Sequence, residues 1–157
     1  YPLCALKDAL DLPGMKVFQF HLKDRADGIR SFDTEPNCIA YTGTHDNNTI
    51  RGWYEQELSE SEQLHIRRML DLGDDVSPEE LVRAVIAYTY RRRAETVIVP
   101  MQDLLALPAA ARMNVPGVAD GNWQWQMTEG QTTFDLARWL AKLLPSQWPL
   151  NILAEME

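Results

Sequence analysis

Three short apolar runs constrain the fold of this chain more than any other feature. Their apolar residues follow one another instead of alternating with polar ones, which is typical of strands that are covered on both faces, as in a parallel sheet. The runs are Met15–Phe20, Cys38–Thr42 and Thr96–Met101. The sequence therefore predicts an α/β architecture with about three parallel strands and flanking helices.

Helical patterns precede and separate the predicted strands. One covers Ala5–Leu10, and two more cover Trp53–Leu58 and Ser59–Leu70. The segment His21–Asn37 shows little helical periodicity, so we expect a loop there.

The clearest helix start in the sequence is at Ser77. Ser77 can cap the helix, Pro78 suits its first position, and Glu80 completes a capping box. The residues that then recur on one face are Leu81, Val82, Val85, Ile86 and Thr89. A last helix is predicted from residues 132–133 to a stop at Pro145, with a buried stripe made of Leu136, Leu140, Leu143 and Leu144.

Three parallel strands make a narrow open sheet and cannot close a barrel. Strands with nearly continuous apolar runs need neighbours on both sides, and an uncovered edge promotes aggregation. We therefore expect residues 1–157 to form a single region of a larger fold.

The composition excludes several kinds of partner. Lys and Arg total 15 against 23 Asp and Glu, a formal charge of -8, so a nucleic acid is not an expected partner, because its binding relies on clustered cations. No apolar run approaches the roughly 20 residues of a membrane helix.

Cys4 and Cys38 fit a reducing, cytoplasmic setting. No spacing of His, Cys and carboxylate residues suggests a metal, and we expect no cofactor.

A run of small and polar residues follows the second predicted strand and carries His45 and Asp46. Active sites of parallel α/β barrels lie at the carboxyl ends of the strands. The Asp46 carboxylate can stabilise positive charge or bind sugar hydroxyls, and the His45 imidazole can donate to another hydroxyl. A cap on the following helix, with His45 at its side, explains the pair equally well.

A second polar pair, Gln102 and Asp103, lies at the end of the third predicted strand. This position next to a buried run makes both residues candidates for the site. The residues alone favour a simpler role, in which Asp103 caps the turn over Leu104–Leu107.

A long loop rich in turn residues covers Arg112–Gln126 and contains Asn114. Long structured loops on a scaffold often bind ligands. The indole faces of Trp123 and Trp125 are suited to stacking on sugar rings, but composition alone favours packing at the base of the loop for both.

Four segments resemble, in order, the amylomaltase family, which comprises the 4-α-glucanotransferases of the α-amylase superfamily. They are Leu12–Phe20, Tyr41–Tyr54, Val99–Leu107 and Arg112–Gln126, and they cover most of the first 126 residues. The resemblance implies that the chain is the C-terminal part of a (β/α)8 TIM barrel, roughly its last three strand–helix units.

The resemblance also implies a reaction and roles for single residues. The family transfers a segment of a 1,4-α-glucan to the 4-hydroxyl of an acceptor glucan or glucose by a retaining double displacement. By resemblance, Asp46 is the carboxylate that stabilises the transition state and His45 binds the same sugar. Gln102, Asp103 and Asn114 are implied substrate-binding residues. The expected partner is a maltooligosaccharide or other α-1,4-glucan, in cytoplasmic maltodextrin or glycogen metabolism.

The chain departs from the family pattern in one respect. The family's nucleophile lies in an Arg-x-Asp motif on an earlier strand and its acid/base in a Glu-Asp-Leu-Gly motif on the next, and both motifs precede the Leu12–Phe20 block. The polar residues Asp24, Arg25 and Asp27 lie in a predicted loop and do not match. We therefore expect the remainder of the barrel to supply both groups, and the isolated chain to be inactive. The alternatives are a non-catalytic α-glucan-binding or structural fragment and, for the whole protein, an amylase-type hydrolase.

Overall fold

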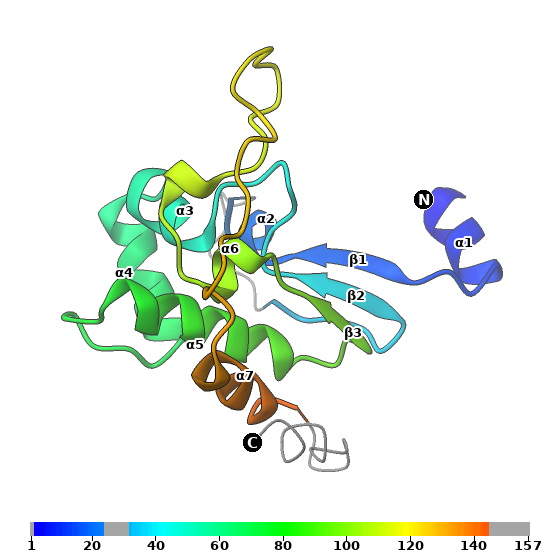
Figure 1. Ribbon diagram of the computed structural model, residues 1–157. Coiled ribbons are helices and arrows are strands. Elements are labelled where there is room, and N and C mark those ends of the chain that lie inside the picture. The colour runs from blue at the N-terminus through cyan, green and yellow to red at the C-terminus, as the bar shows by residue number, and fades with distance from the viewer. Residues whose placement is uncertain (1, 24–31, 145–157) are drawn as a thin grey trace. The chain divides into compact units, whose positions relative to one another are not determined.

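The structure is a computed structural model that describes residues 2–23 and 32–144 (Figure 1). The chain divides into two compact units, Tyr1–Trp125 and Gln126–Glu157, and each is described by itself below. The first unit contains the sheet and every candidate site residue named from the sequence.

The first unit is built on a sheet of three parallel strands in the order β1-β2-β3. The strands are β1 (Gly14–Val17), β2 (Cys38–Tyr41) and β3 (Thr96–Ile98). Their register pairs Val17 with Tyr41 and Tyr41 with Ile98, so the three strands end level with one another. The predicted parallel sheet is therefore confirmed, and the segments that follow its strands meet at one edge.

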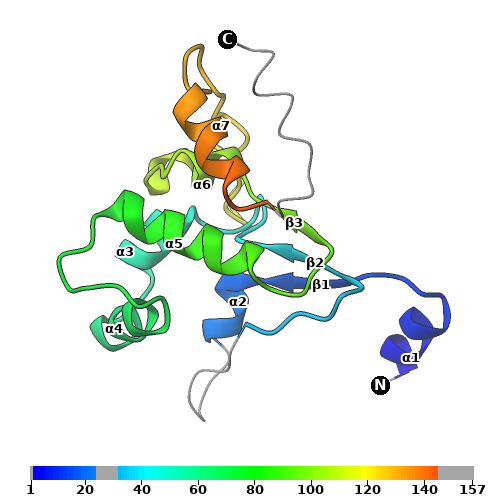
Figure 2. The same cartoon turned by 90° about the horizontal axis from the view of Figure 1, so that it is seen from below.

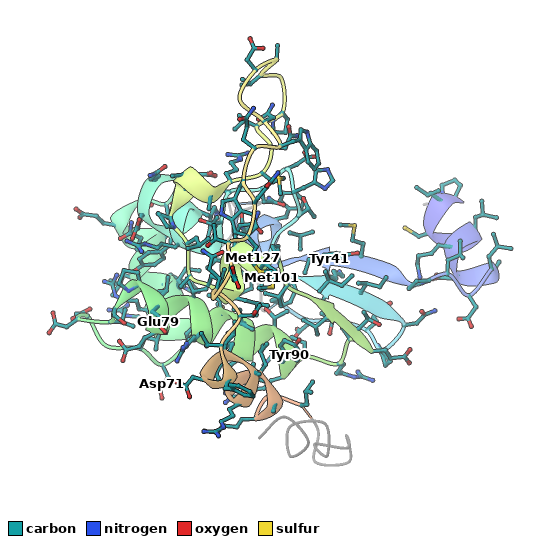
Figure 3. All side chains as sticks on the ribbon, viewed as in Figure 1. Tyr41, Asp71, Glu79, Tyr90, Met101 and Met127 are labelled. Atoms are coloured by element: carbon teal, nitrogen blue, oxygen red, sulfur yellow. The ribbon has the colours of Figure 1, made fainter. Side chains whose placement is uncertain are left out.

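All three strands are shorter than predicted, the second by the single residue Thr42. The run Met15–Phe20 leaves the sheet at Val17, and helix α2 (Phe18–Lys23) begins at once. The third strand ends at Ile98, and helix α6 (Met101–Leu104), labelled at Met101 in Figure 3, follows it. An apolar run without a period does not distinguish a strand from a buried helical turn, which explains both errors.

The predicted loop His21–Asn37 is wrong at its start, because its first three residues complete α2. The polar residues Asp24, Arg25 and Asp27 lie outside the described residues. The described remainder, from Phe32 to Asn37, contains no helix or strand before β2.

Side-chain caps fix the starts of the surrounding helices. Capping boxes pair Ser59 with Glu62 and Ser77 with Glu80, and the second confirms the predicted helix start. These boxes satisfy backbone N–H groups that have no partner within the first turn of a helix. The first unit's remaining helices are α1 (Pro2–Ala9), α3 (Ile50–Gln56), α4 (Glu60–Met69), α5 (Pro78–Tyr90) and the 3-10 turn η1 (Ala109–Ala111).

The core of the first unit is centred on Phe18, which is fully buried. Its ring makes edge-to-face contacts with Phe32, Trp53 and Tyr88, with centroid distances of 5.6, 6.0 and 6.1 Å. Figures 1 and 2 show α3, α4 and α5 grouped on one side of the strands. The buried face predicted for α5 is confirmed at all of its positions, namely Leu81, Val82, Val85, Ile86 and Thr89.

A close helix contact connects the core to the long loop that follows η1. A Cβ atom placed on Gly52 of α3 would lie 2.7 Å from the Cα atom of Ala109 in η1. Only glycine permits this approach. The contact between Gly52 and Ala109 therefore fixes the position of η1, from which the long loop starts.

The second unit contains helix α7 (Phe134–Ala141). The Thr133 hydroxyl accepts a hydrogen bond from the backbone N–H of Leu136 at 3.2 Å, so the predicted helix start is confirmed. Leu136 is buried, whereas the rest of the predicted stripe, Leu140, Leu143 and Leu144, is half-buried. The predicted stop at Pro145 lies outside the described residues. Within residues 2–23 and 32–144, no helix has both the length and the apolar character needed to cross a membrane.

Candidate functional site

Each of the three strands is followed by a buried polar side chain. Gln19 follows β1, Thr42 follows β2 and Asp103 follows β3, and all three are at most 2% exposed. The Gln19 side chain donates from Nε2 to the carbonyl oxygen of Asn48 at 2.7 Å. The sequence pattern does not indicate this role for Gln19, because the residue lies within a predicted strand.

Asp103 joins the end of β2 to the start of α3. The Thr42 hydroxyl donates to Oδ2 of Asp103 at 2.7 Å, and the backbone N–H of Ile50 donates to Oδ1 at 2.8 Å. Burial raises the pKa of Asp103 to about 6, against the lowering effect of these two hydrogen bonds. Asp103 therefore does not cap its own turn but holds both ends of the segment that carries His45 and Asp46.

A tight turn shapes the segment between those ends. Oδ1 of Asn47 accepts hydrogen bonds from the backbone N–H of Thr44 at 2.9 Å and from its hydroxyl at 2.8 Å. The cap of α3 is Thr49, whose hydroxyl accepts from the N–H of Gly52 at 3.0 Å. Asp46 is therefore not the helix cap that the sequence left open, and its side chain is available for another role.

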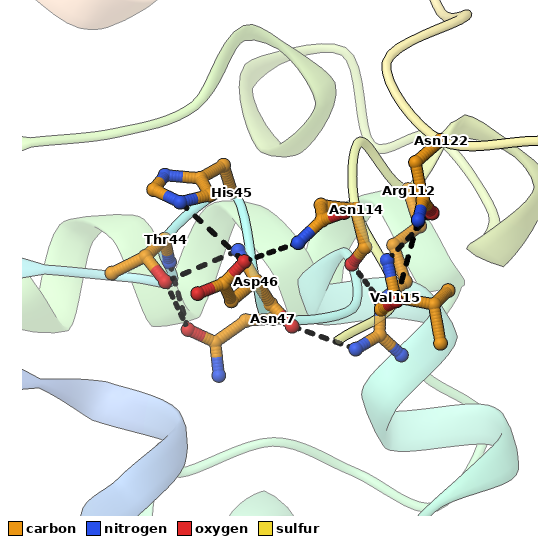
Figure 4. Close-up of polar contacts among 8 residues, drawn as sticks. All are labelled: Thr44, His45, Asp46, Asn47, Arg112, Asn114, Val115 and Asn122. Carbon is orange, nitrogen blue, oxygen red and sulfur yellow. Dashed lines mark hydrogen bonds and ion pairs between the residues drawn. The ribbon is translucent and has the colours of Figure 1, made fainter. Parts of the chain in front are cut away.

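The Asp46 carboxylate lies between an imidazole and an amide (Figure 4). Nδ2 of Asn114 donates to Oδ1 of Asp46 at 2.5 Å, and Nε2 of His45 lies 3.4 Å from the same oxygen. The side chains of His45 and Asp46 are about half-exposed, at 57% and 48%. Two predicted site residues, His45 and Asn114, are thus brought to the predicted catalytic carboxylate.

Arg112 fastens the long loop to the turn, and sequence reasoning did not single it out. Its guanidinium donates to the carbonyl oxygens of Asp46 at 2.6 Å and of Asn114 at 2.8 Å (Figure 4). The Asn114 N–H donates in turn to the carbonyl oxygen of His45 at 3.1 Å. Because Arg112 and Asp46 are 66 residues apart in the sequence, no local pattern could have indicated their contact.

A pocket of about 170 Å³ adjoins this cluster. Three of the predicted residues line it, namely His45, Gln102 and Asp103, together with Trp123. Asp46 and Asn114 are not among its lining residues. Within the described part of the chain, no group of three or more His, Cys, Asp and Glu residues could hold a metal ion.

The arrangement is suited to binding a neutral, hydroxyl-rich ligand. It offers a half-exposed carboxylate as acceptor, imidazole and amide groups, and an aromatic wall beside the pocket. Its place beyond the carboxyl ends of parallel strands is that of the active sites of β/α-barrel enzymes, and this is the class of protein that the fold and site define.

Comparison with known proteins identifies the family. Residues 3–132 match the family model described as 4-alpha-glucanotransferase, and the chain belongs to this family. It is 39% identical over 129 residues to a 4-alpha-glucanotransferase of Streptococcus pneumoniae, covering 82% of this chain and 25% of the relative. A chloroplastic/amyloplastic 4-alpha-glucanotransferase of Solanum tuberosum is 37% identical over 131 residues, with coverages of 83% and 22%. The chain thus spans about a quarter of the length of these relatives.

Solved structures agree with this assignment. The amylomaltase from Streptococcus agalactiae in complex with acarbose superposes with a TM-score of 0.79 at 32% identity, covering 90% of this chain and 28% of that chain. An amylomaltase from Corynebacterium glutamicum, at 14% identity and a TM-score of 0.53, shares the fold, with coverages of 75% and 22%. The fold class expected from the sequence, about three parallel strands and flanking helices from a (β/α)8 barrel, is confirmed.

Proposed function

We propose that this chain supplies the transition-state-stabilising carboxylate, Asp46, to a 4-α-glucanotransferase. The observation that carries the proposal is the half-exposed Asp46 side chain, held by Asn114 and facing solvent beyond the carboxyl end of β2. In a retaining double displacement the reacting sugar acquires positive charge, which a fixed carboxylate stabilises.

The substrate that we propose is a maltooligosaccharide or another α-1,4-glucan. The amylomaltase from Streptococcus agalactiae was solved with acarbose, and this supports an α-glucan as the ligand here. His45 and Asn114 bind the sugar beside Asp46, and Gln102 lines the adjoining pocket. Asp103, expected from the resemblance to bind substrate, has both oxygens bonded within the protein, so we propose that it acts by positioning the turn.

In this proposal, residues 1–157 form a single region of the barrel. The nucleophile and the acid/base come from the remainder of the barrel. The large apolar side chains of Met15 in β1, Phe20 in α2 and Ile98 in β3 are 58%, 55% and 44% exposed. Further strands of a closed barrel would cover such side chains. The cytoplasmic location, and the place in maltodextrin or glycogen metabolism, stay predictions, since the similar proteins include chloroplastic or amyloplastic ones.

A disproportionation assay with maltotriose tests the proposal. The complete protein that contains this chain should release glucose and form longer glucans, whereas the 157-residue chain should be silent, because transfer needs a nucleophile and an acid/base about 5 Å apart. Activity in the chain itself would contradict the assignment. Glucose without longer glucans would indicate a hydrolase.

The second candidate function is α-glucan binding without catalysis, and the missing Arg-x-Asp and Glu-Asp-Leu-Gly motifs favour it for the chain alone. Titration with maltoheptaose, followed by tryptophan fluorescence, separates the two non-catalytic possibilities. Saturable quenching indicates a binding fragment, and a flat response indicates a structural one.

A further inference from the structure

The loop after η1 is built to hold Trp123 in one place. The Asn122 side chain accepts from the N–H of Val115 at 2.8 Å and donates to the carbonyl oxygen of Val118 at 2.8 Å. The N–H of Trp123 donates to the carbonyl oxygen of Met113 at 2.7 Å. These bonds tie both ends of the loop together and fix the backbone from which the indole projects.

The backbone conformation of Trp123 is unfavourable for its side chain. Its φ of 61° lies in the left-handed region, which bulky residues rarely adopt and glycine adopts without strain. The side chain is also 60% exposed, so core packing does not compensate for the strain. Strained residues of this kind are concentrated at functional sites.

The indole lies beside the proposed sugar-binding groups. Its ring centroid is 5.2 Å from that of His45, with an angle of 38° between the planes. Both residues line the pocket next to Gln102, and His45 is also the neighbour of Asp46 and contacts its carboxylate. One apolar surface and several hydroxyl-binding groups therefore stand together.

We propose that Trp123 is a substrate-affinity residue: its exposed indole is the platform on which one pyranose ring of the α-glucan stacks. This inference rests on the proposed function. A pyranose ring has a face of C–H groups and an equator of hydroxyls. The C–H face is complementary to the electron-rich face of the indole, while the hydroxyls reach His45, Asp46 and Asn114.

The test is Trp123→Gly in the complete protein, assayed by maltotriose disproportionation. Glycine removes the indole and relieves the strain at the same time. We expect KM to rise roughly three- to tenfold, the range that an aromatic contact provides, with kcat within about twofold, because stacking stabilises the ground and transition states alike. The unfolding temperature should not fall, and Trp123→Phe should give an intermediate KM.

Asp71, labelled in Figure 3, follows α4 and has a φ of 57°. The variant Asp71→Gly relieves the same kind of strain there and is the matched control. It should leave KM unchanged. A Trp123→Gly variant with unchanged KM and a lower unfolding temperature would overturn the proposal in favour of packing. A fall in kcat at unchanged KM would overturn it in favour of an effect through His45.

The failure of the proposed function gives a different result. In that case the unmodified protein does not disproportionate maltotriose, and the variant is compared by maltoheptaose titration instead. Because the variant lacks the indole that would report binding by fluorescence, this titration is followed by calorimetry: loss of the binding heat in Trp123→Gly would still support the platform, and an unchanged affinity would contradict it.

Discussion

The turn that carries His45 and Asp46 is held on two sides, and the two sides differ in burial. On the inner side, Gln19, Thr42 and Asp103 are at most 2% exposed and bond to its backbone or to its ends. On the outer side, Asn114 bonds to the Asp46 side chain itself, where that side chain is about half-exposed. The inner bonds fix where the turn lies, and the outer bond fixes where the carboxylate points.

This difference separates effects on stability from effects on catalysis. A buried polar group that loses its partner costs free energy because water cannot replace the partner, whereas an exposed group is readily resolvated. We therefore expect changes on the inner side to lower stability first, and changes on the outer side to lower turnover while the fold stays intact.

The largest expected effect is that of Asp46→Asn in the complete protein. Asparagine keeps the shape and can still accept from Asn114, but it lacks the negative charge to which the proposed function assigns the stabilisation of the transition state. Turnover of maltotriose should fall about a thousandfold, equivalent to roughly 4 kcal/mol, with an unchanged unfolding temperature.

A suitable control for that variant is Asp120→Asn, which removes an exposed carboxylate from the long loop after η1. It should leave turnover unchanged. A loss of less than about tenfold in Asp46→Asn, or roughly 1.4 kcal/mol, would contradict the role given to Asp46.

The next effect in size is a pH dependence of stability due to Asp103. Its pKa is about 6 in the folded protein and 3.8 ordinarily, so the folded state binds the proton more tightly. The stabilisation is complete below about pH 4 and is lost as the pH rises through 6, a change on the order of 3 kcal/mol.

Other groups titrate in the same range, so the measurement is the difference between the unmodified protein and Asp103→Asn. The difference in unfolding free energy should move by about 3 kcal/mol between pH 4 and pH 7, in favour of the variant at the higher pH. If Asp103→Asn does not fold, Thr42→Val serves instead: it removes a bond that lowers the Asp103 pKa, so the loss of stability should extend to a higher pH than in the unmodified protein. A difference independent of pH would show that Asp103 is not the titrating group.

The sequence was most informative where a periodic pattern or a cap governs the local structure. The capping box at Ser77 and the buried face of α5 followed from residue types at fixed spacings, and the parallel pairing of the strands followed from continuous apolar runs separated by helical patterns. His45 and Asp46 were selected in the same way, because the polar run begins where an apolar run ends.

The rest depended on contacts between distant segments. The place where β1 becomes α2 is set by the packing of Phe18 against Trp53 and Tyr88, so Gln19 was assigned to a strand and its bond to Asn48 was missed. The partners of Asp103, Thr42 and Ile50, are 61 and 53 residues away, so the local residues alone favour a cap for it. Periodicity does not encode such bonds.

The smallest effect that still distinguishes the two sides is that of Asn114→Ala. It removes the amide that fixes the Asp46 carboxylate but leaves Arg112 and the inner bonds in place, so kcat should fall about tenfold, or roughly 1.4 kcal/mol. The unfolding temperature should stay the same, because both side chains are accessible to water.

Asn37→Ala is the matched control. Asn37 donates to the Asp11 carboxylate at 2.9 Å near the amino end of the sheet, which is the same kind of bond away from the site. Equal losses of activity in the two variants, or a marked loss of stability in Asn114→Ala, would mean that the outer bond supports the fold as the inner bonds do, and the contrast between the two sides would not hold.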